Sequence, residues 1–243
     1  MLESAHPRST RIEALGDAAL VIHFGERIDP LVNAHVLASA ERLRAAAWPG
    51  ILDLIPAYAT LTVCYDPGEW LAAQLRERLL QLLSGRGPRD LHSSARARAP
   101  VEIPVCYEGE FAPDLEAVCV HTGLGAAEFV RRHHAAQYRV YFIGFMPGFP
   151  YLGGLDAALA VPRRATPRSE VPPGSVAIGG EQTGIYPHAA PGGWHIIGRT
   201  PLRLFDARRA DPCLLRAGDR LRFVPVARRE YQRLQEDLAR GGA

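Results

Sequence analysis

Apolar and polar residues alternate in the first part of the chain with the short period of β-strands. The alternation over residues 11–24 is interrupted at Gly16, which predicts a β-hairpin with a turn of two residues or more. The spacing then becomes helical, with Asp29 placed as N-cap and Pro30 at the first helical position, where its missing N–H costs nothing. The apolar series that predicts this helix is Leu31, Val32, Val36, Leu37, Ala40 and Leu43.

Two further strands and a second helix complete this first region. Residues 51–58 and 60–65 read as strands, and the apolar spacing of residues 70–83 predicts an amphipathic helix. With the hairpin and the first helix they form a β-β-α-β-β-α unit, residues 10–84, which we expect to be a small α/β sandwich domain. Residues 85–100 contain almost no large apolar side chains and predict a linker between two domains.

The second domain, residues 101–240, is expected to consist mostly of short strands separated by turn residues, a pattern typical of a β-barrel or sandwich. Two short helices are predicted at residues 113–121 and 126–136, and a last helix at 228–240. The chain is therefore expected to be an α+β protein. The strands predicted in this domain are residues 101–107, 138–143, 175–178, 194–197, 202–205 and 221–226.

Residues 141–206 have an unusual composition, because 11 of the 23 glycines and 9 of the 20 prolines lie there. Disordered tracts rich in these residues lack aromatic side chains, whereas this region contains many, so we expect it to be ordered. Paired glycines bring backbone N–H groups close to a ligand, although each glycine alone is explained as well by a tight turn. We expect these loops to fold over a pocket, with the aromatic rings either forming its walls or filling the barrel.

Composition and charge exclude several functions. All 28 basic residues are arginine, so this chain supplies neither a Walker-type lysine nor a Schiff-base lysine. The net charge of +2 does not suggest nucleic-acid binding. The four cysteines lie far apart without metal-site spacing, and no apolar run approaches membrane length. We therefore expect a cytoplasmic protein with no metal ligands, no nucleic-acid partner and no membrane association.

Two groups of residues are candidates for chemistry. Arg163, Arg164 and Arg168 lie within six residues beside two prolines, which suits bidentate capture of a carboxylate or phosphate but also describes a solvated charged loop. His133 and His134 are neighbours on a predicted helix, so their side chains point about 100° apart and at most one faces a pocket. Histidine is a natural proton-transfer residue near neutral pH, yet a lone histidine beside apolar residues is also common in cores.

Several motifs in the second domain resemble the KipI family. They are GFMPGFPYLGG, PRRATPR followed by VPPGSV, TGIYP and PGGWHIIGRTP, in that order. This family contains the B subunit of 5-oxoprolinase and the first subunit of bacterial allophanate hydrolase or urea carboxylase systems. The resemblance implies a cyclophilin-like β-barrel preceded by a small α/β domain. It does not imply prolyl isomerase activity, because function belongs to the site and not to the fold.

The resemblance also implies a function and a site. Stand-alone bacterial members most often serve as the B subunit of an ATP-dependent 5-oxoprolinase, which opens 5-oxoproline to glutamate together with an A subunit and with a C subunit, the expected closest partner. ATP is then used by the assembled complex, and this chain is expected to be inactive alone. Arg164 and Arg168 are expected to bind a carboxylate or phosphate, and His133 to transfer a proton. The residues expected to bind substrate are Phe145, Pro147, Gly148, Phe149, Tyr151, Tyr186, Gly192, Gly193, Trp194 and Arg199.

Two alternatives within the family remain open. One is a KipI-type inhibitor of a sensor histidine kinase, which needs an exposed apolar patch and no small-molecule pocket. The other is a carboxyltransferase subunit of a urea carboxylase or allophanate hydrolase system, working with a biotin domain that this chain lacks. Within the motifs, His133 matches the family's usual histidine, but His134 replaces a small hydroxylic residue, so the sequence does not decide which of the two faces the pocket.

Overall fold

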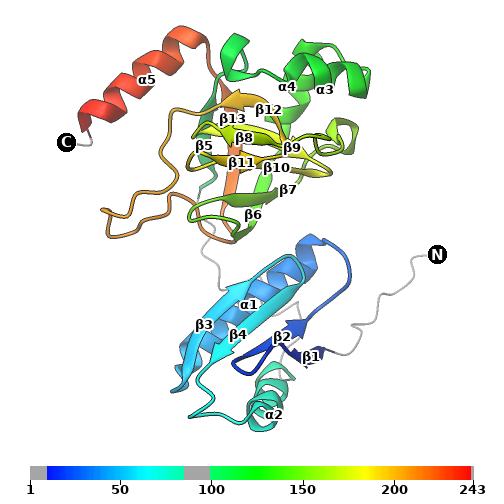
Figure 1. The fold of residues 1–243 in the computed structure, drawn as a ribbon, viewed down its shortest axis with the longest axis vertical. Coiled ribbons are helices and arrows are strands. Elements are labelled where there is room, and N and C mark those ends of the chain that lie inside the picture. Colours follow the sequence, from blue (N-terminus) through cyan, green and yellow to red (C-terminus); the bar gives the residue numbers. More distant parts are fainter. Residues whose placement is uncertain (1–9, 85–98, 242–243) are drawn as a thin grey trace. The chain divides into compact units, whose positions relative to one another are not determined.

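The computed structural model describes residues 10–84 and 99–241 of the chain (Figure 1). By its internal contacts the chain divides into two compact units, with the boundary between residues 97 and 98. That boundary falls within the segment predicted to be a linker, of which residues 85–98 lie outside the described part. Each unit has its own hydrophobic core.

The first unit is a four-stranded antiparallel sheet with two helices packed on one face. The β1–β2 hairpin pairs Ile12 with Ile22, as the alternating pattern predicts. The predicted order of strands and helices is confirmed throughout this unit. In spatial order the strands are β1 (Arg11–Ala14), β2 (Ala19–His23), β4 (Thr60–Tyr65) and β3 (Ile51–Pro56), and the helices are α1 (Pro30–Ala46) and α2 (Ala72–Leu83).

Helix α1 begins where its local signals predict. The carboxylate of Asp29 accepts hydrogen bonds from the backbone N–H groups of Leu31, at 2.7 Å, and Val32, at 3.1 Å, which satisfies two donors of the first turn. Val36 and its helical neighbours on the same stripe are buried against the sheet. Leu31 was expected on that stripe but is 60% exposed, because it lies about 200° around the helix from the buried Asn33.

The second unit is a barrel-like sheet of seven strands in the order β12-β9-β10-β7-β6-β13-β5. Neighbouring strands are antiparallel except β13 and β5, which are parallel. Cys106 and Arg199 exchange two backbone hydrogen bonds of 2.9 Å, which join the end of β5 to β12 and nearly close the sheet. The bounds are β5 (Val101–Val105), β6 (Tyr138–Ile143), β7 (Pro150–Gly153), β9 (Ser175–Gly179), β10 (Gln182–Ile185), β12 (His195–Arg199) and β13 (Arg220–Pro225).

Helices cover parts of this barrel (Figure 1). Helix α3 (Leu115–Thr122) and helix α4 (Ala126–Ala135) lie side by side, and α4 packs on β13. After β13 the chain forms α5 (Arg228–Gly241), whose Tyr231 packs against Phe111 with a ring separation of 4.4 Å. Short 3-10 turns, η2 (Gly109–Phe111) and η3 (Ala157–Leu159), complete the second unit.

The glycine-rich region differs most from the sequence prediction. The strand expected at residues 202–205 is wrong, since only one isolated bridge, between Phe205 and Cys213, forms there. Pro201 offers no backbone N–H, and the next residues form a turn in which Asp206 accepts a hydrogen bond from the backbone of Arg208. Conversely, β7 and β10 were not predicted, nor were β8 (Arg168–Val171) and β11 (Ala190–Gly192), which pair as a separate two-stranded sheet.

Candidate functional site

An aromatic cluster forms the centre of the glycine-rich region. Phe149, Tyr186 and Trp194 are buried together, with the Phe149 ring centroid 5.2 Å from that of Tyr186 and 5.7 Å from that of Trp194. Glycines occur where these rings need space: a Cβ atom on Gly179 would lie 2.6 Å from the Trp194 indole, and one on Gly192 would lie 2.4 Å from the Tyr186 hydroxyl. The rings therefore fill the space between strands, and the glycines permit that packing.

Phe145 stands apart from the other rings because it is exposed. Its side chain is 62% exposed, and its φ of +66° lies in the left-handed region that a bulky residue rarely adopts. Its ring meets Phe149 edge-on at 5.5 Å, beside Gly148, whose φ is +81°. Such a backbone costs on the order of 1–3 kcal/mol and is often found at functional sites. The exposed Pro147 belongs to the same turn.

The arginine loop, residues 162–168, lies against this cluster and shares one acidic partner. Arg168 makes two hydrogen bonds of 2.7 and 2.8 Å to the carboxylate of Asp114, and Arg164 makes a third of 2.9 Å. The backbone N–H of Arg164 also donates to the carbonyl of Gly193 at 2.8 Å. Two of the three loop arginines are therefore bound to a single carboxylate, and the loop is tied to the turn that precedes Trp194.

Asp114 is a residue that sequence reasoning missed. It is 4% exposed, and besides the two arginines it accepts a hydrogen bond of 2.7 Å from the backbone N–H of Ile196. Burial raises the pKa of Asp114, but the hydrogen bonds from Arg168 and Ile196 and the two arginine charges outweigh burial and hold that pKa below its ordinary value. The sequence signal was an aspartate just before a helix, which suggests an N-cap, yet Asp114 makes no such side-chain bond.

His133 points into the barrel core, where it is fully buried. Its Nδ1 lies 2.8 Å from the hydroxyl of Tyr107, and its Nε2 lies 3.2 Å from the hydroxyl of Thr183. Because the Thr183 hydroxyl donates to the carbonyl of Ala177, it accepts from Nε2–H, which leaves Nδ1 to accept from Tyr107. Burial, with a smaller contribution from the charge of His134, lowers the pKa of His133 to about 3. His133 is therefore a neutral, fully bonded core residue at neutral pH.

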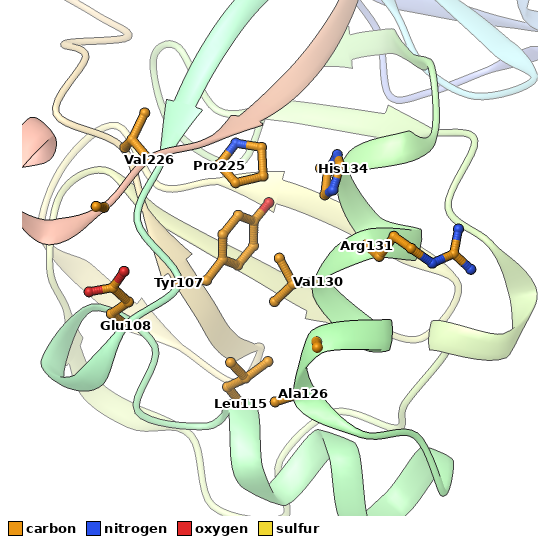
Figure 2. A pocket seen from close by; sticks show the side chains of 11 residues that line it. Tyr107, Glu108, Leu115, Ala126, Val130, Arg131, His134, Pro225 and Val226 are labelled. Carbon is orange, nitrogen blue, oxygen red and sulfur yellow. The ribbon is translucent and has the colours of Figure 1, made fainter.

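Two adjoining hollows lie beside this histidine network, with volumes of about 440 and 590 Å³. Both are lined by Tyr107, Leu115 and Ala126. Figure 2 shows Tyr107 in the middle of the smaller hollow, with His134 and Pro225 towards one end. Of the two adjacent histidines, the structure therefore places His134 at a hollow and His133 in the core. None of the residues predicted to bind substrate lines either hollow.

The structure thus brings together some of the predicted site residues and separates others. Arg199 lies at the end of β12 with its guanidinium 5.6 Å from the Phe111 ring, in a different cluster from Trp194. His133 belongs to the barrel core. The residues that gather around the aromatic cluster and the arginine loop are Phe145, Pro147, Gly148, Phe149, Tyr151, Arg164, Arg168, Tyr186, Gly192, Gly193 and Trp194.

Neither a metal centre nor a membrane-spanning helix is found in the described ranges. Over residues 10–84 and 99–241, no group of three or more histidine, cysteine, aspartate and glutamate side chains is placed to hold a metal ion. Within the same ranges no helix has the length and apolarity needed to cross a bilayer. The four cysteines are free thiols. The candidate site contains two arginines bonded to Asp114 beside a cluster of aromatic rings.

Comparisons with known proteins identify the family. Residues 10–215 match the carboxyltransferase domain, subdomain C and D. The chain is 42% identical to the 5-oxoprolinase B subunit of Bacillus subtilis (strain 168), over 93% of this chain and 97% of that protein, and 42% identical to the 5-oxoprolinase B subunit of Escherichia coli O157:H7, over 88% and 95%. The crystal structure of TTHA0988 is similar with a TM-score of 0.74 and 41% identity over 86% of this chain, which spans 40% of that longer one. The chain therefore belongs to the family of carboxyltransferase domains, subdomains C and D, that includes the B subunit of 5-oxoprolinase.

Proposed function

We propose that this chain is the B subunit of an ATP-dependent 5-oxoprolinase and that it acts with the A and C subunits to convert 5-oxo-L-proline to L-glutamate. The observation that carries the proposal is the 42% identity to the 5-oxoprolinase B subunit of Bacillus subtilis over 93% of this chain and 97% of that protein. Because the similarity extends over both units, it concerns the whole chain rather than one shared motif.

The chemistry of such a reaction suits the candidate site. A lactam resists direct hydrolysis, so ATP is expected to phosphorylate the carbonyl oxygen, releasing ADP. One water then attacks the activated carbon and the ring C–N bond opens, which leaves an acyl phosphate, and a second water hydrolyses this acyl phosphate to the carboxylate and phosphate. The substrate carboxylate and the ATP phosphates are both anions. The cluster of Arg164, Arg168 and Asp114 carries two positive charges and one negative charge, so the arginine loop keeps a positive balance towards such anions.

The contacts suggest supporting roles for the three residues that the sequence singled out. We infer that Arg164 and Arg168 act first by holding Asp114 and thereby fixing the loop against Gly193. His133 has both ring nitrogens engaged inside the barrel, so we infer that it orients Tyr107 rather than transferring a proton itself.

The test is reconstitution with omission. This chain is co-expressed and purified with candidate A and C subunits, and 5-oxoproline-dependent ATP hydrolysis and glutamate release are measured with each component left out in turn. We expect both products to form at matched rates only when this chain is present. A complete, soluble complex that hydrolyses no ATP in response to 5-oxoproline would contradict the proposal.

A further inference from the structure

The arginine loop contains a third arginine, Arg163, whose charge is not paired with an acidic residue of the described ranges. Arg164 and Arg168 bond to Asp114, whereas Arg163 makes no ion pair or hydrogen bond with any residue of the described ranges. Its side chain is exposed. The fold therefore leaves this guanidinium, with its five donors, available to a ligand.

The backbone on both sides of Arg163 is anchored. The carbonyl of Pro162 accepts a hydrogen bond of 3.1 Å from Nε2 of His195, and the N–H of Arg164 donates to the carbonyl of Gly193 at 2.8 Å. Both anchors belong to the segment that carries Trp194. The backbone of Arg163 is thus held in a fixed place, while its charged group has no carboxylate partner among the residues that the structure describes.

The side chain of Arg163 lies over the aromatic cluster. Its guanidinium carbon is 6.0 Å from the centroid of the Trp194 ring, at the limit of a cation–π contact. Burial raises the pKa values of Tyr151 and Tyr186, and the positive charge of Arg163 opposes this rise in both. The exposed Phe145, edge-on to Tyr186 at 6.4 Å, lies beside the same rings. The Arg163 cation therefore lies at the aromatic cluster, next to the Trp194 ring.

An anion cannot bind Arg164 or Arg168 equally well. To offer the N–H groups that now bond Asp114, either arginine would have to leave that carboxylate, and removing a partner from a buried carboxylate is strongly unfavourable. If both arginines stayed in place, the negative charge of Asp114 would offset part of their attraction for the incoming anion. Arg163 carries neither penalty.

We propose that Arg163 is the arginine that contacts the anionic ligand, an oxyanion of the carboxylate or phosphate class, beside the aromatic cluster that contains Trp194, while Arg164 and Arg168 position the loop. The inference rests on the proposed function, in which two oxyanions are present: the carboxylate of 5-oxoproline and the phosphates of ATP. A third possibility, an acidic side chain of a partner protein, is a separate outcome of the test.

The first experiment titrates the isolated full-length chain, labelled with ¹⁵N, with 5-oxo-L-proline and, separately, with ATP. The indole N–H signal of Trp194 reports the site, and those of Trp48 and Trp70, which lie in the first unit, are internal controls. We expect one of the two ligands to shift the Trp194 signal. The Arg163→Ala substitution should lower the affinity for that ligand by about ten-fold or more, the size expected for a lost charge-assisted hydrogen bond. Wild-type protein whose Trp194 signal responds to neither ligand would overturn the proposal.

The second experiment uses the reconstituted enzyme. Arg163→Ala should raise the KM for the same ligand by a similar factor and leave the Tm unchanged. Arg163→Lys keeps the positive charge but lacks the planar guanidinium, so its KM should lie between those of wild type and Arg163→Ala. Arg164→Ala and Arg168→Ala should instead lower the Tm. The control is Arg229→Ala, which removes an exposed arginine of α5 and should change neither the KM nor the Tm.

Unchanged KM values in Arg163→Ala, or failure of that variant to assemble with the other chains, would overturn the proposal. A wild-type complex without activity, but with a Trp194 signal that still responds, would contradict the proposed function alone.

Discussion

The burial of His133 predicts how the stability of the second unit depends on pH. The pKa of this histidine falls from its ordinary 6.5 to about 3 in the folded chain. Between these two values the unfolded chain binds a proton at His133 that the folded chain does not bind. The free energy of unfolding must therefore decrease as the pH falls through this window. The contribution of the buried, neutral His133 to stability is complete only above pH 6.5.

The size of the effect follows from the difference in bound protons. Each pH unit below the ordinary pKa removes about 1.4 kcal/mol while one proton separates the two states. The loss between about pH 8 and about pH 4.5 is therefore about 2.7 kcal/mol from this one residue. The His133→Gln variant keeps a donor and an acceptor but has no titrating group, so it should lack this part of the loss whatever its stability at the higher pH.

The assay is urea unfolding of wild type and His133→Gln at these two pH values, followed through the indole signal of Trp194 so that only the second unit is observed. Other titrating groups, including His35, whose pKa is lowered chiefly by burial, are common to both proteins and cancel in the difference. Equal losses of stability in the two proteins, or a His133 ring signal that titrates at the ordinary histidine pKa, would refute the reasoning.

Three further predictions concern single contacts. Asp29→Ala removes the cap of α1 and should cost about 1 kcal/mol in urea unfolding of the first unit; no change would mean that the cap is unimportant. Gly179→Ala places a Cβ 2.6 Å from the Trp194 indole and should cost about 1–3 kcal/mol, whereas Gly125→Ala, with open space around it, should cost much less; equal costs would contradict the packing argument. Because the pKa of Asp114 is lowered, its contribution to stability is present above its ordinary pKa and is lost as the pH falls below it. Acid unfolding curves should therefore show a smaller acid loss for Asp114→Asn than for wild type, and identical losses would exclude an ionised Asp114 as the residue that holds the two arginines.

Much of the fold could be predicted because the signals were local. Helix α1 shows this clearly, since its N-cap, its first-turn proline and its apolar spacing all lie within one segment. Strands β7 and β10 were missed for the opposite reason. Gly184 in β10 resembles a turn residue in sequence, but it is a glycine because the Phe149 ring would lie 2.9 Å from its Cβ. That contact joins residues far apart in the chain and leaves no local pattern.

The candidate site could be predicted only in part for the same reason. The run of arginines between prolines indicated an anion-binding loop, but the partner of Arg164 and Arg168 is 50 and 54 residues away in the sequence. Nothing near Asp114 indicates that role. Helical spacing correctly implied that His133 and His134 point in different directions. Which of them faces the core depends on how α4 packs on β13, where His133 stacks on Phe223 at 4.6 Å, and that contact is not local either.

The most direct test of the central claim is to titrate purified chain into a fixed amount of the other two 5-oxoprolinase components and to follow phosphate release that depends on 5-oxoproline. If the chain is the B subunit, activity should rise from background and reach a plateau at a defined ratio of the three chains. A rate that stays at background at every concentration, although the chains form a complex, would contradict the assignment of this chain to 5-oxoprolinase.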